Sequence, residues 1–234
     1  MGFGAYLFRP ERLTGPPVFF WNGLPFAFYR VFLCRLGDDN LKAVIVSQSA
    51  NGGDGRGGQQ DAFERILLVD ADDRPQGDGD KLDVHRLGQL HRAFSIFIFN
   101  TRGEVLLQRR ADVKYHFAGY WSNSCCGHPR PGEETASAAV RRLGEELGFQ
   151  TPLIEQTQLV YRAEDARSGL IEHEYLHVFR GRYADDPRPD PAEVGAWRWT
   201  SVSAVRRGLI KSPHLFTPWF QLIAERVLDS AAAE

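Results

Sequence analysis

The sequence predicts an α+β protein in which a mixed β-sheet is flanked by helices. Extended runs rich in β-branched and aromatic residues lie before and after one central amphipathic helix. Further helix signals follow near the C-terminal end, and the chain has no internal repeat. Strands on both sides of one helix, with more helices at the end of the chain, are typical of a layered sandwich.

The first extended segments precede the central helix. Residues 65–70 form a short apolar run that stops at an Asp-rich turn, and a polar segment with Lys81 and His85 follows. Residues 91–100 and 104–110 are β-rich runs separated by a short turn sequence that ends in Gly. This spacing predicts a β-hairpin.

The central helix ends at Leu147, where Gly148 is the expected C-terminal stop. Its apolar stripe comprises Ala136, Val140, Leu143 and Leu147. At roughly 100° per residue, Glu146 falls about 80° from this stripe and Glu145 lies nearly opposite it. Arg142 precedes Glu146 by one helical turn, so a carboxylate and a guanidinium share the edge of the core. For the helix taken alone, an ordinary ion pair on a solvated face is the alternative.

Two more strands are predicted after this helix, at residues 156–163 and 171–183. The alternation in the second strand separates Glu172, Glu174 and Leu176 on one face from His173, Tyr175 and His177 on the other. Two carboxylates therefore point to the same side of the sheet.

The chain ends with one more strand and two helices. Residues 195–200 are the strand, and a short helix runs from about Ser203. Thr217 and Pro218 have the residue types of an N-cap and a first helical position, so a terminal helix begins there.

Composition restricts the class of function. An apolar fraction of 43% with 25% charged residues is typical of a globular protein, and 234 residues allow one domain with an extension. The net charge of −2 argues against a nucleic-acid partner, which a basic excess would indicate. The chain has 3 cysteines, two of them adjacent, which form no disulfide framework. We therefore expect a reducing, cytoplasmic location.

The N-terminal part differs from the rest. Residues 18–34 are apolar and aromatic but are interrupted by polar residues, Gly and Pro, so we expect neither a membrane span nor a signal peptide. Residues 51–60 are a Gly-rich flexible linker. The sequence thus divides into an extension of unassigned function, residues 1–60, and a catalytic domain, residues 61–234. We expect removal of the extension to leave activity and stability unchanged, unless its aromatic residues dock on the domain.

Imidazoles and carboxylates recur in the segments around the central helix: His85, His91, His128, Glu172 and Glu174. Together they offer nitrogen and oxygen ligands of the kind that Mn²⁺, Zn²⁺ or Mg²⁺ accepts. Spacing alone leaves two interpretations open, a divalent-metal site and a set of solvated polar residues.

Cys126 lies two residues before His128, in the loop that leads to the central helix. Neighbouring basic residues would lower its pKa and favour a reactive thiolate. The alternative is a small buried residue, which is the commoner role of a free cysteine.

Several cations are spread over the same segments: Lys81, Arg109, Arg110, Lys114 and Arg142. Each alone fits a surface charge, but converging on one pocket they would clamp a phosphate group. Trp199 is expected in the core, with a ligand-facing position as the alternative.

From Arg65 to about Trp219 the sequence resembles the type I isopentenyl-diphosphate isomerases of the Nudix superfamily. The matching segments are LHRAFSIFIFN (90–100), LLQRRADVK (106–114), WSNSCCGHP (121–129), GHPRPGEETASAAVRRLGEELGF (127–149), YRAED (161–165) and IEHEY (171–175). A Nudix hydrolase has a glutamate after the first arginine of the box, where this chain has Arg142 after Arg141. The His85–His91 interval is one residue shorter than in bacterial members. The resemblance implies a Nudix α/β/α sandwich.

The resemblance also implies roles for individual residues. His85, His91, His128, Glu172 and Glu174 would bind a divalent metal, Mn²⁺ or Zn²⁺. Cys126 and Glu174 would be the acid/base pair, and Tyr161 would hydrogen-bond near Glu174. Glu146 would hold a Mg²⁺ that bridges to the diphosphate of a small-molecule substrate. Lys81, Arg110, Lys114 and Arg142 would contact that diphosphate, and Trp199 would face the hydrocarbon.

The expected reaction interconverts isopentenyl and dimethylallyl diphosphate in isoprenoid biosynthesis. Protonating an alkene gives a tertiary carbocation that water would trap, so a dry, electron-rich site with two proton-transfer groups is required. The alternatives are a Nudix hydrolase of nucleoside-diphosphate derivatives and a catalytically silent Nudix binding module. Arg142 argues against the hydrolase, and a silent module would not need Cys126.

Overall fold

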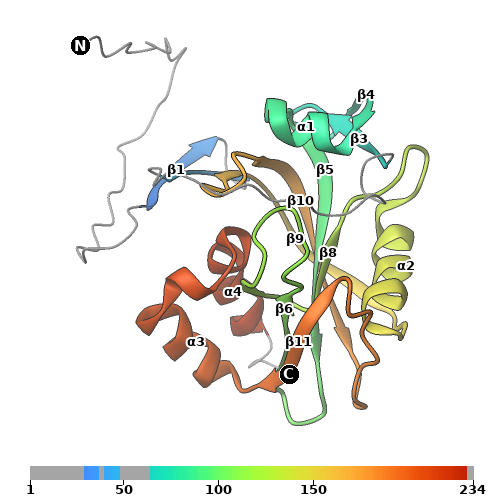
Figure 1. The fold of residues 1–234 in the computed structure, drawn as a ribbon, viewed down its shortest axis with the longest axis vertical. Coiled ribbons are helices and arrows are strands. Elements are labelled where there is room, and N and C mark those ends of the chain that lie inside the picture. The colour runs from blue at the N-terminus through green and yellow to red at the C-terminus, as the bar shows by residue number, and fades with distance from the viewer. Residues whose placement is uncertain (1–28, 37–39, 48–63, 231–234) are drawn as a thin grey trace.

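The computed structural model describes residues 29–36, 40–47 and 64–230, the first two stretches as backbone only (Figure 1). The predicted Gly-rich linker at 51–60 lies outside the described residues. Among the described helices, none is long and apolar enough to cross a membrane.

The centre of the fold is a mixed sheet, as predicted. β9 (Leu153–Glu164) pairs antiparallel with β10 (Ile171–Arg182), and β10 pairs parallel with β5 (His91–Phe99). The other strands of the sheet are β1 (Tyr29–Leu36), β2 (Asn40–Ser47), β3 (Arg65–Val69), β4 (Pro75–Asp80), β6 (Val105–Arg110), β7 (Trp121–Ser122), β8 (Cys125–Gly127) and β11 (Val194–Thr200).

Helices cover both faces of this sheet, which confirms the predicted layers. α2 (Thr135–Leu147) lies on one side, and α3 (Val202–Lys211) and α4 (Pro218–Ser230) lie on the other, with the short η2 (Pro213–Leu215) between the last two in the chain (Figure 1). β5 is apolar on both faces because it contributes to both layers. Ala93, Phe97 and Phe99 join the core next to α4, whereas Phe94, Ile96 and Ile98 join the core next to α2.

The predicted hairpin of β5 and β6 is wrong beyond its turn. The two strands pair only at Phe99 and Val105 and then diverge. β7 pairs with β6 and β8 pairs with β5, so the Trp121–Gly127 segment occupies the opening. The buried Ser124 hydroxyl links the diverging strands, because it donates to the Leu106 carbonyl at 2.7 Å and accepts from the Ile98 N–H at 2.8 Å. Tertiary pairing thus replaces the local ladder.

The polar segment with Lys81 and His85 is the helix α1 (Lys81–Leu87), which the sequence did not predict. Asp80 caps it by accepting from the backbone N–H groups of Leu82 and Asp83, and Gly88 ends it with φ 61°. The preceding residues form β4, which pairs with β3 where the sequence predicted only a turn.

α2 ends at Leu147 with Gly148 in a left-handed conformation, as predicted. The predicted apolar stripe is displaced, because Ala138 and Ala139 are fully buried whereas Ala136 and Val140 are only partly buried. The buried Glu146 and the exposed Glu145 confirm the predicted orientation of the two carboxylates.

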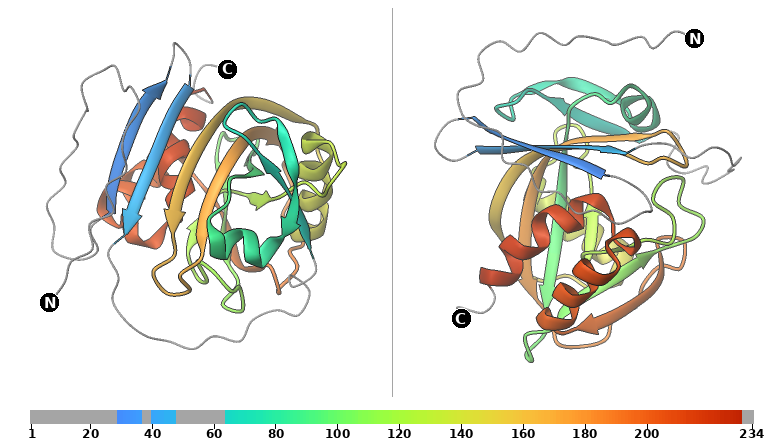
Figure 2. Two further views of the ribbon diagram at one scale, coloured as in Figure 1. Left: turned by 90° about the horizontal axis from the view of Figure 1, so that it is seen from above. Right: turned by 90° about the vertical axis from the view of Figure 1, so that its left-hand side faces the viewer.

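The sheet continues into the predicted extension. β1 and β2 form an antiparallel pair, and β2 lies parallel to β9 at Lys42–Val44 and Val160–Arg162 (Figure 2). Part of residues 1–60 therefore lies at the edge of the same sheet.

Candidate active site

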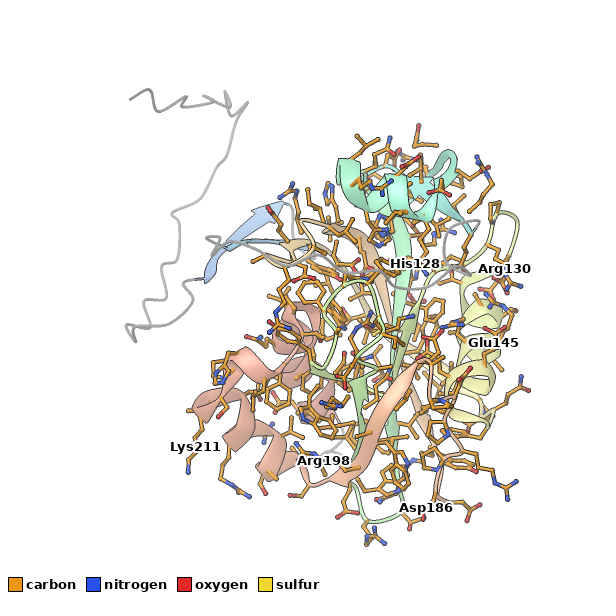
Figure 3. The ribbon with its side chains drawn as sticks, in the orientation of Figure 1. His128, Arg130, Glu145, Asp186, Arg198 and Lys211 are labelled. Atoms are coloured by element: carbon orange, nitrogen blue, oxygen red, sulfur yellow. The ribbon has the colours of Figure 1, made fainter. Side chains whose placement is uncertain are left out.

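One cavity lies where β5, β8, β9 and β10 meet α2 and α4. Its empty volume, including the open mouth, is about 570 Å³, within the ~300–1,000 Å³ of small-molecule sites. Ten of the predicted site residues line it: Lys81, Arg110, Lys114, Cys126, His128, Arg142, Glu146, Tyr161, Glu172 and Glu174. Figure 3 places His128 close to α1 and β5, whereas Asp186, Arg198 and Lys211 lie toward the opposite end of the molecule.

His85, His91, His128 and Glu172 converge on one point. Each offers one ligand atom, and these atoms lie within 4.8 Å of one another. The His85 Nε2, His91 Nε2 and Glu172 Oε2 atoms are buried without a hydrogen-bond partner. Buried polar atoms are rarely left unpaired, so this arrangement fits a divalent cation bound between them.

Hydrogen bonds at Nδ1 of His85 and His91 fix the tautomer that a metal ligand needs, with Nε2 unprotonated. His85 Nδ1 lies 2.6 Å from the Lys81 carbonyl, and His91 Nδ1 lies 2.9 Å from the Gln89 carbonyl. Each Nδ1 therefore carries the proton, which leaves Nε2 with a free lone pair directed at the cluster. Burial lowers the pKa of His91 to about 3, so its ring is neutral at physiological pH. The helix α1 creates this geometry by presenting the Lys81 carbonyl to His85.

The register of the central strands aligns the acid/base residues in one row. Tyr161 of β9 and His91 of β5 both lie opposite Glu174 of β10. The Tyr161 hydroxyl donates to Glu174 Oε2 at 2.7 Å, while Glu174 Oε1 lies 3.3 Å from His128 Nε2. Burial and the neighbouring Glu172 charge raise the pKa of Glu174 well above its usual range. Its carboxyl group is thus able to hold a proton inside the cavity.

Cys126 is held on β8, beside Ser95 of β5. Its Sγ lies 3.4 Å from the Ser95 hydroxyl and 3.3 Å from the Asn123 side-chain carbonyl, to which the thiol donates. Burial raises the pKa of the thiol to about 11. The expectation of a thiolate is therefore wrong, because desolvation and the charges of Glu146 and Glu174 outweigh the hydrogen bonds of Ser95 and Asn123, which lower the pKa.

Close packing explains why residue 127 is a glycine. A Cβ at Gly127 would meet the Phe94 ring at 2.9 Å and Arg142 Cγ at 3.3 Å. Glycine at this position therefore lets β8 lie against both β5 and α2, and it directs His128 into the cluster.

The four predicted substrate-binding cations face the same cavity. Lys81 Nζ lies 2.8 Å from Glu64 Oε2, and Lys114 Nζ lies 2.7 Å from Glu193 Oε2. Arg110 donates to the His116 carbonyl at 3.2 Å from Nη2. Arg142 is paired with acidic groups, which raise its pKa although burial opposes its charge. Arg109, by contrast, pairs with Asp112 and does not line the cavity.

Glu146 is bonded at both carboxylate oxygens. Arg142 Nη2 lies 2.5 Å from Oε1, and Gln108 Nε2 donates to Oε2 at 3.2 Å. Glu146 lies outside the histidine cluster but lines the cavity beside the basic residues. The predicted i,i+4 neighbours on α2 thus contribute to the cavity wall as well as to an ion pair.

Trp199 is not among the residues that line this cavity, so its place beside the hydrocarbon stays a prediction. It lies on β11 opposite Leu106 and packs against the core next to α2. Trp219, at the start of α4, lines the cavity instead. Its Nε1–H donates to the Ser122 hydroxyl at 2.9 Å, which fixes the ring. No local pattern indicated this role, because Trp219 belongs to the apolar stripe of a terminal helix.

Other residues of the site were also missed: Ser95, His116, Asn123, Gln108 and Glu193. Ser95 is a polar residue within an otherwise apolar strand, and this interruption could have indicated a site. The others lie in loops or pair with residues distant in sequence, so their contacts depend on the tertiary structure.

Comparisons with known proteins agree with this site. Residues 89–220 match the NUDIX domain family. The chain is 50% identical over 165 residues to the isopentenyl-diphosphate Delta-isomerase of Halorhodospira halophila, covering 70% of this chain and 94% of that protein. It is 51% identical over 163 residues to the isomerase of the same name from Burkholderia multivorans, covering 70% and 92%.

A solved structure from Deinococcus radiodurans shares the fold, with a TM-score of 0.59 and 18% identity over 70% of this chain and 98% of that one. The fold and the sequence identity over nearly the full length of these relatives lead to one conclusion. The chain belongs to the isopentenyl-diphosphate Delta-isomerase family of NUDIX-domain proteins.

Proposed function

We propose that this protein interconverts isopentenyl diphosphate and dimethylallyl diphosphate, since its relatives are named isopentenyl-diphosphate Delta-isomerase. The observation that supports this best is that two proton-transfer groups with raised pKa, the partly buried Cys126 and the buried Glu174, line one cavity. Moving a double bond requires one proton to be added to the carbon chain and another to be removed.

The acid/base pair is Cys126 and Glu174. One group gives a proton to the alkene, and the other takes a proton from the carbon next to the cation; the roles exchange in the reverse direction. Tyr161 orients Glu174 through its 2.7 Å hydrogen bond. Ser95 and Asn123 orient the Cys126 thiol. Both groups are held in place before the substrate binds, which favours a fast proton transfer.

The diphosphate is bound by Lys81, Arg110, Lys114 and Arg142. Glu64 pairs with Lys81 and Glu193 pairs with Lys114. Both glutamates also line the cavity, so they keep the two lysine side chains directed at it. Arginine and lysine donors give charge-assisted hydrogen bonds to phosphate oxygens. Anchoring one end of the substrate fixes the hydrocarbon between the acid and the base.

Two divalent cations complete this proposal. His85, His91, His128, Glu172 and Glu174 hold Mn²⁺ or Zn²⁺, which suits their nitrogen and oxygen ligands. When bound, this cation supplies positive charge that eases proton loss from Glu174. Glu146 is the residue that holds Mg²⁺ beside the diphosphate.

The wall that faces the carbocation is Trp219. Its indole face provides electron density without a nucleophile, so it stabilises positive charge and excludes water. Trp219 also contacts the Arg110 guanidinium, whose Cζ lies 5.7 Å from the ring. The aromatic wall is therefore continuous with the diphosphate-binding end.

The competing hydrolase reaction makes a different product. A Nudix hydrolase needs glutamates that hold metals and activate water, whereas here Arg142 forms an ion pair with Glu146. The test is incubation of the purified protein with isopentenyl diphosphate, Mg²⁺ and Mn²⁺, followed by separation of the products. Dimethylallyl diphosphate without released phosphate supports the isomerase. Released phosphate without isomerised product contradicts it.

The substrate is thus a small-molecule diphosphate, and the free Cys125 and Cys126 agree with the expected cytoplasmic location. Neither a nucleic acid nor a membrane is part of this proposal.

A further inference from the structure

His116 is a buried residue of the connection between β6 and β7. Neither the sequence analysis nor the proposed mechanism assigns it a role. Its side chain is 7% exposed, and its ring centroid lies 5.6 Å from that of His85. Its Nε2 lies 2.5 Å from Glu172 Oε1. This is the shortest of the contacts between a histidine and Glu172 or Glu174 in the described part of the chain.

The 2.5 Å contact requires a proton between the two atoms. Two bare acceptors at this distance would repel each other, so either nitrogen or oxygen carries hydrogen. An ionised glutamate carboxylate can only accept a hydrogen bond, whereas a neutral imidazole carries one N–H, on either Nδ1 or Nε2. The proton therefore belongs to His116 Nε2.

The other ring nitrogen agrees with this assignment. His116 Nδ1 is buried and has no hydrogen-bond partner. A buried N–H without an acceptor is unfavourable, because it loses its hydrogen bond to water and gains none in the protein. A neutral ring with its proton on Nε2 leaves only a lone pair unpaired at Nδ1.

Glu172 thus has two differently used oxygens. Oε1 accepts from His116, whereas Oε2 lies 3.3 Å from His85 Nε2 and is the unpartnered oxygen of the cluster. The terminal torsion of a glutamate is broad and sets few restraints of its own. A hydrogen bond at one oxygen therefore decides where the other oxygen points.

We propose that His116 is a positioning residue for the metal centre, which donates from Nε2 to Glu172 Oε1 and thereby directs Oε2 to the divalent cation. This inference rests on the proposed metal centre. His116 does not ligate through Nε2, because this atom carries the proton that bonds to Glu172. It also lies outside the group of converging ligand atoms. Hydrogen bonds of this kind to ligating groups change metal affinity by about 10–100-fold.

The position of His116 connects two parts of the site. Its backbone carbonyl accepts from Arg110 Nη2 at 3.2 Å, so its main chain helps to place a cation of the diphosphate-binding end. A side-chain substitution keeps this carbonyl. We therefore expect loss of the imidazole to weaken metal binding more than substrate binding.

The test compares two variants of the full-length protein. His116→Phe keeps a ring of similar size and removes the donor, whereas His116→Gln retains an N–H group. We expect His116→Phe to raise the Kd for Mn²⁺, measured by chelator competition, by about 10–100-fold. We expect His116→Gln to recover most of this loss. In the His116→Phe protein, kcat should fall at limiting Mn²⁺ and return toward the wild-type value at excess Mn²⁺. The KM for isopentenyl diphosphate should change little.

His177→Phe is the matched control. His177 is equally buried, at 7% exposure, and also bonds to carboxylates, with Nδ1 2.7 Å from Glu155 Oε1. It does not line the cavity, so its replacement should leave the Kd for Mn²⁺ unchanged. Visible spectra of the Co²⁺-loaded proteins give a second readout, because loss of a ligand changes the band intensity.

Several results would overturn the inference. A wild-type Kd in His116→Phe contradicts it, and so does a folded His116→Gln protein that binds as poorly as His116→Phe. If His116→Phe does not fold, His116→Gln decides: near-normal Mn²⁺ binding supports the inference, and weak binding overturns it. A large change in Co²⁺ band intensity would make His116 a ligand and overturn the positioning role. Failure of wild type to bind Mn²⁺ removes the inference but not the isomerase, whereas metal binding without isomerisation removes the isomerase alone.

Discussion

Cys126 differs from its neighbour Cys125 in what surrounds the sulfur. Cys126 is partly buried, lines the cavity and donates to Asn123, whereas Cys125 is fully buried in the core next to α2. The acid/base role can therefore belong to only one of these adjacent residues, and the register of β8 against β5 selects Cys126.

We expect Cys126→Ala to abolish isomerisation with the fold retained, with a loss in kcat of at least about 10²-fold, because general acid–base groups contribute that much. Cys125→Ala is the matched variant and should keep most activity, since it removes one sulfur from the core. Steady-state kinetics and circular dichroism measure both. An inactive Cys125→Ala beside an active Cys126→Ala would show that the roles are reversed.

The protonated state of Cys126 has a measurable consequence. Its pKa is raised to about 11 by burial, and only the thiolate reacts with iodoacetamide. Below the pKa the neutral thiol predominates, so alkylation of Cys126 should be slow at pH 7 and accelerate as the pH rises toward 11. Mass spectrometry of the alkylated peptide against pH tests this in the Cys125→Ala protein. An alkylation midpoint below pH 8 would show that Cys126 is a thiolate near neutral pH, as the sequence predicted.

At the scale of elements, the segment that carries β7 and β8 links the thiol to the aromatic wall. Trp219 donates to Ser122, Ser122 donates to Asn123 Oδ1 at 2.9 Å, and Cys126 donates to the same oxygen at 3.3 Å. The Asn123 amide is fixed in turn by the Ile96 and Cys125 carbonyls, at 3.1 and 2.9 Å. One buried side chain thus sets the position of the thiol.

We expect Asn123→Ala to lower kcat by about 10²-fold, because misplacing a catalytic group by about 1 Å has an effect of that size. The free energy of unfolding should fall by about 1 kcal/mol for each lost hydrogen bond. Asn100→Ala is the control, since Asn100 is a buried asparagine that bonds within its turn, with Nδ2 2.8 Å from Glu104. Equal kcat losses in both variants would reduce the Asn123 effect to general destabilisation.

The four ligands of the cluster come from four parts of the chain. His85 lies on α1, His91 on β5, His128 in the loop between β8 and α2, and Glu172 on β10. We expect His91→Ala, His128→Ala and Glu172→Gln each to lower metal content and activity together, because the remaining ligands are poorly placed without the fourth. The unpartnered Nε2 of His85 puts His85→Ala in the same group. His173→Ala is the control, because His173 lies on the other face of β10 and its Nδ1 contacts the Gly88 carbonyl at 2.9 Å. Full metal occupancy in all four ligand variants would disprove a shared site.

At the scale of the molecule, the cavity lies at the junction of the two core layers, and its lining residues within the described part of the chain run from Glu64 to Trp219. The edge of the sheet beyond β9 is formed by β2 and β1 (Figure 2). β2 contacts β9 along the Val160–Arg162 stretch, which includes Tyr161. The catalytic unit that we propose, residues 61–234, therefore borders the extension at this edge of the sheet.

We expect removal of residues 1–60 to leave kcat, KM and metal content unchanged, since the described lining residues all remain. Comparison of melting temperatures shows how much the pairing of β2 with β9 stabilises the sheet. A clear fall in turnover would show that the extension helps to place Tyr161, and the boundary near Gln60 would then be wrong. A fall in melting temperature alone would assign it a structural role.

The sequence by itself determined the elements with strong local signals. The α2 helix with Gly148 as its stop, the strands β9, β10 and β11, and the face of β10 that carries Glu172 and Glu174 follow from periodicity and capping. The motif around Cys126 also gave the family, because a cysteine, a glycine and a histidine at this spacing are recognisable without any contact.

Only the tertiary structure decided which distant residues meet. The pairing of β5 with β10 opened the predicted hairpin, since burial of both faces of β5 outweighs a local ladder. The segment at Lys81–Leu87 became a helix because Asp80 and Gly88 cap it, although its polar sequence has no apolar period. Trp219, rather than Trp199, faces the cavity because α4 packs over the sheet there, and His116 reaches Glu172 across a loop. Such contacts depend on packing between elements, which no local pattern contains.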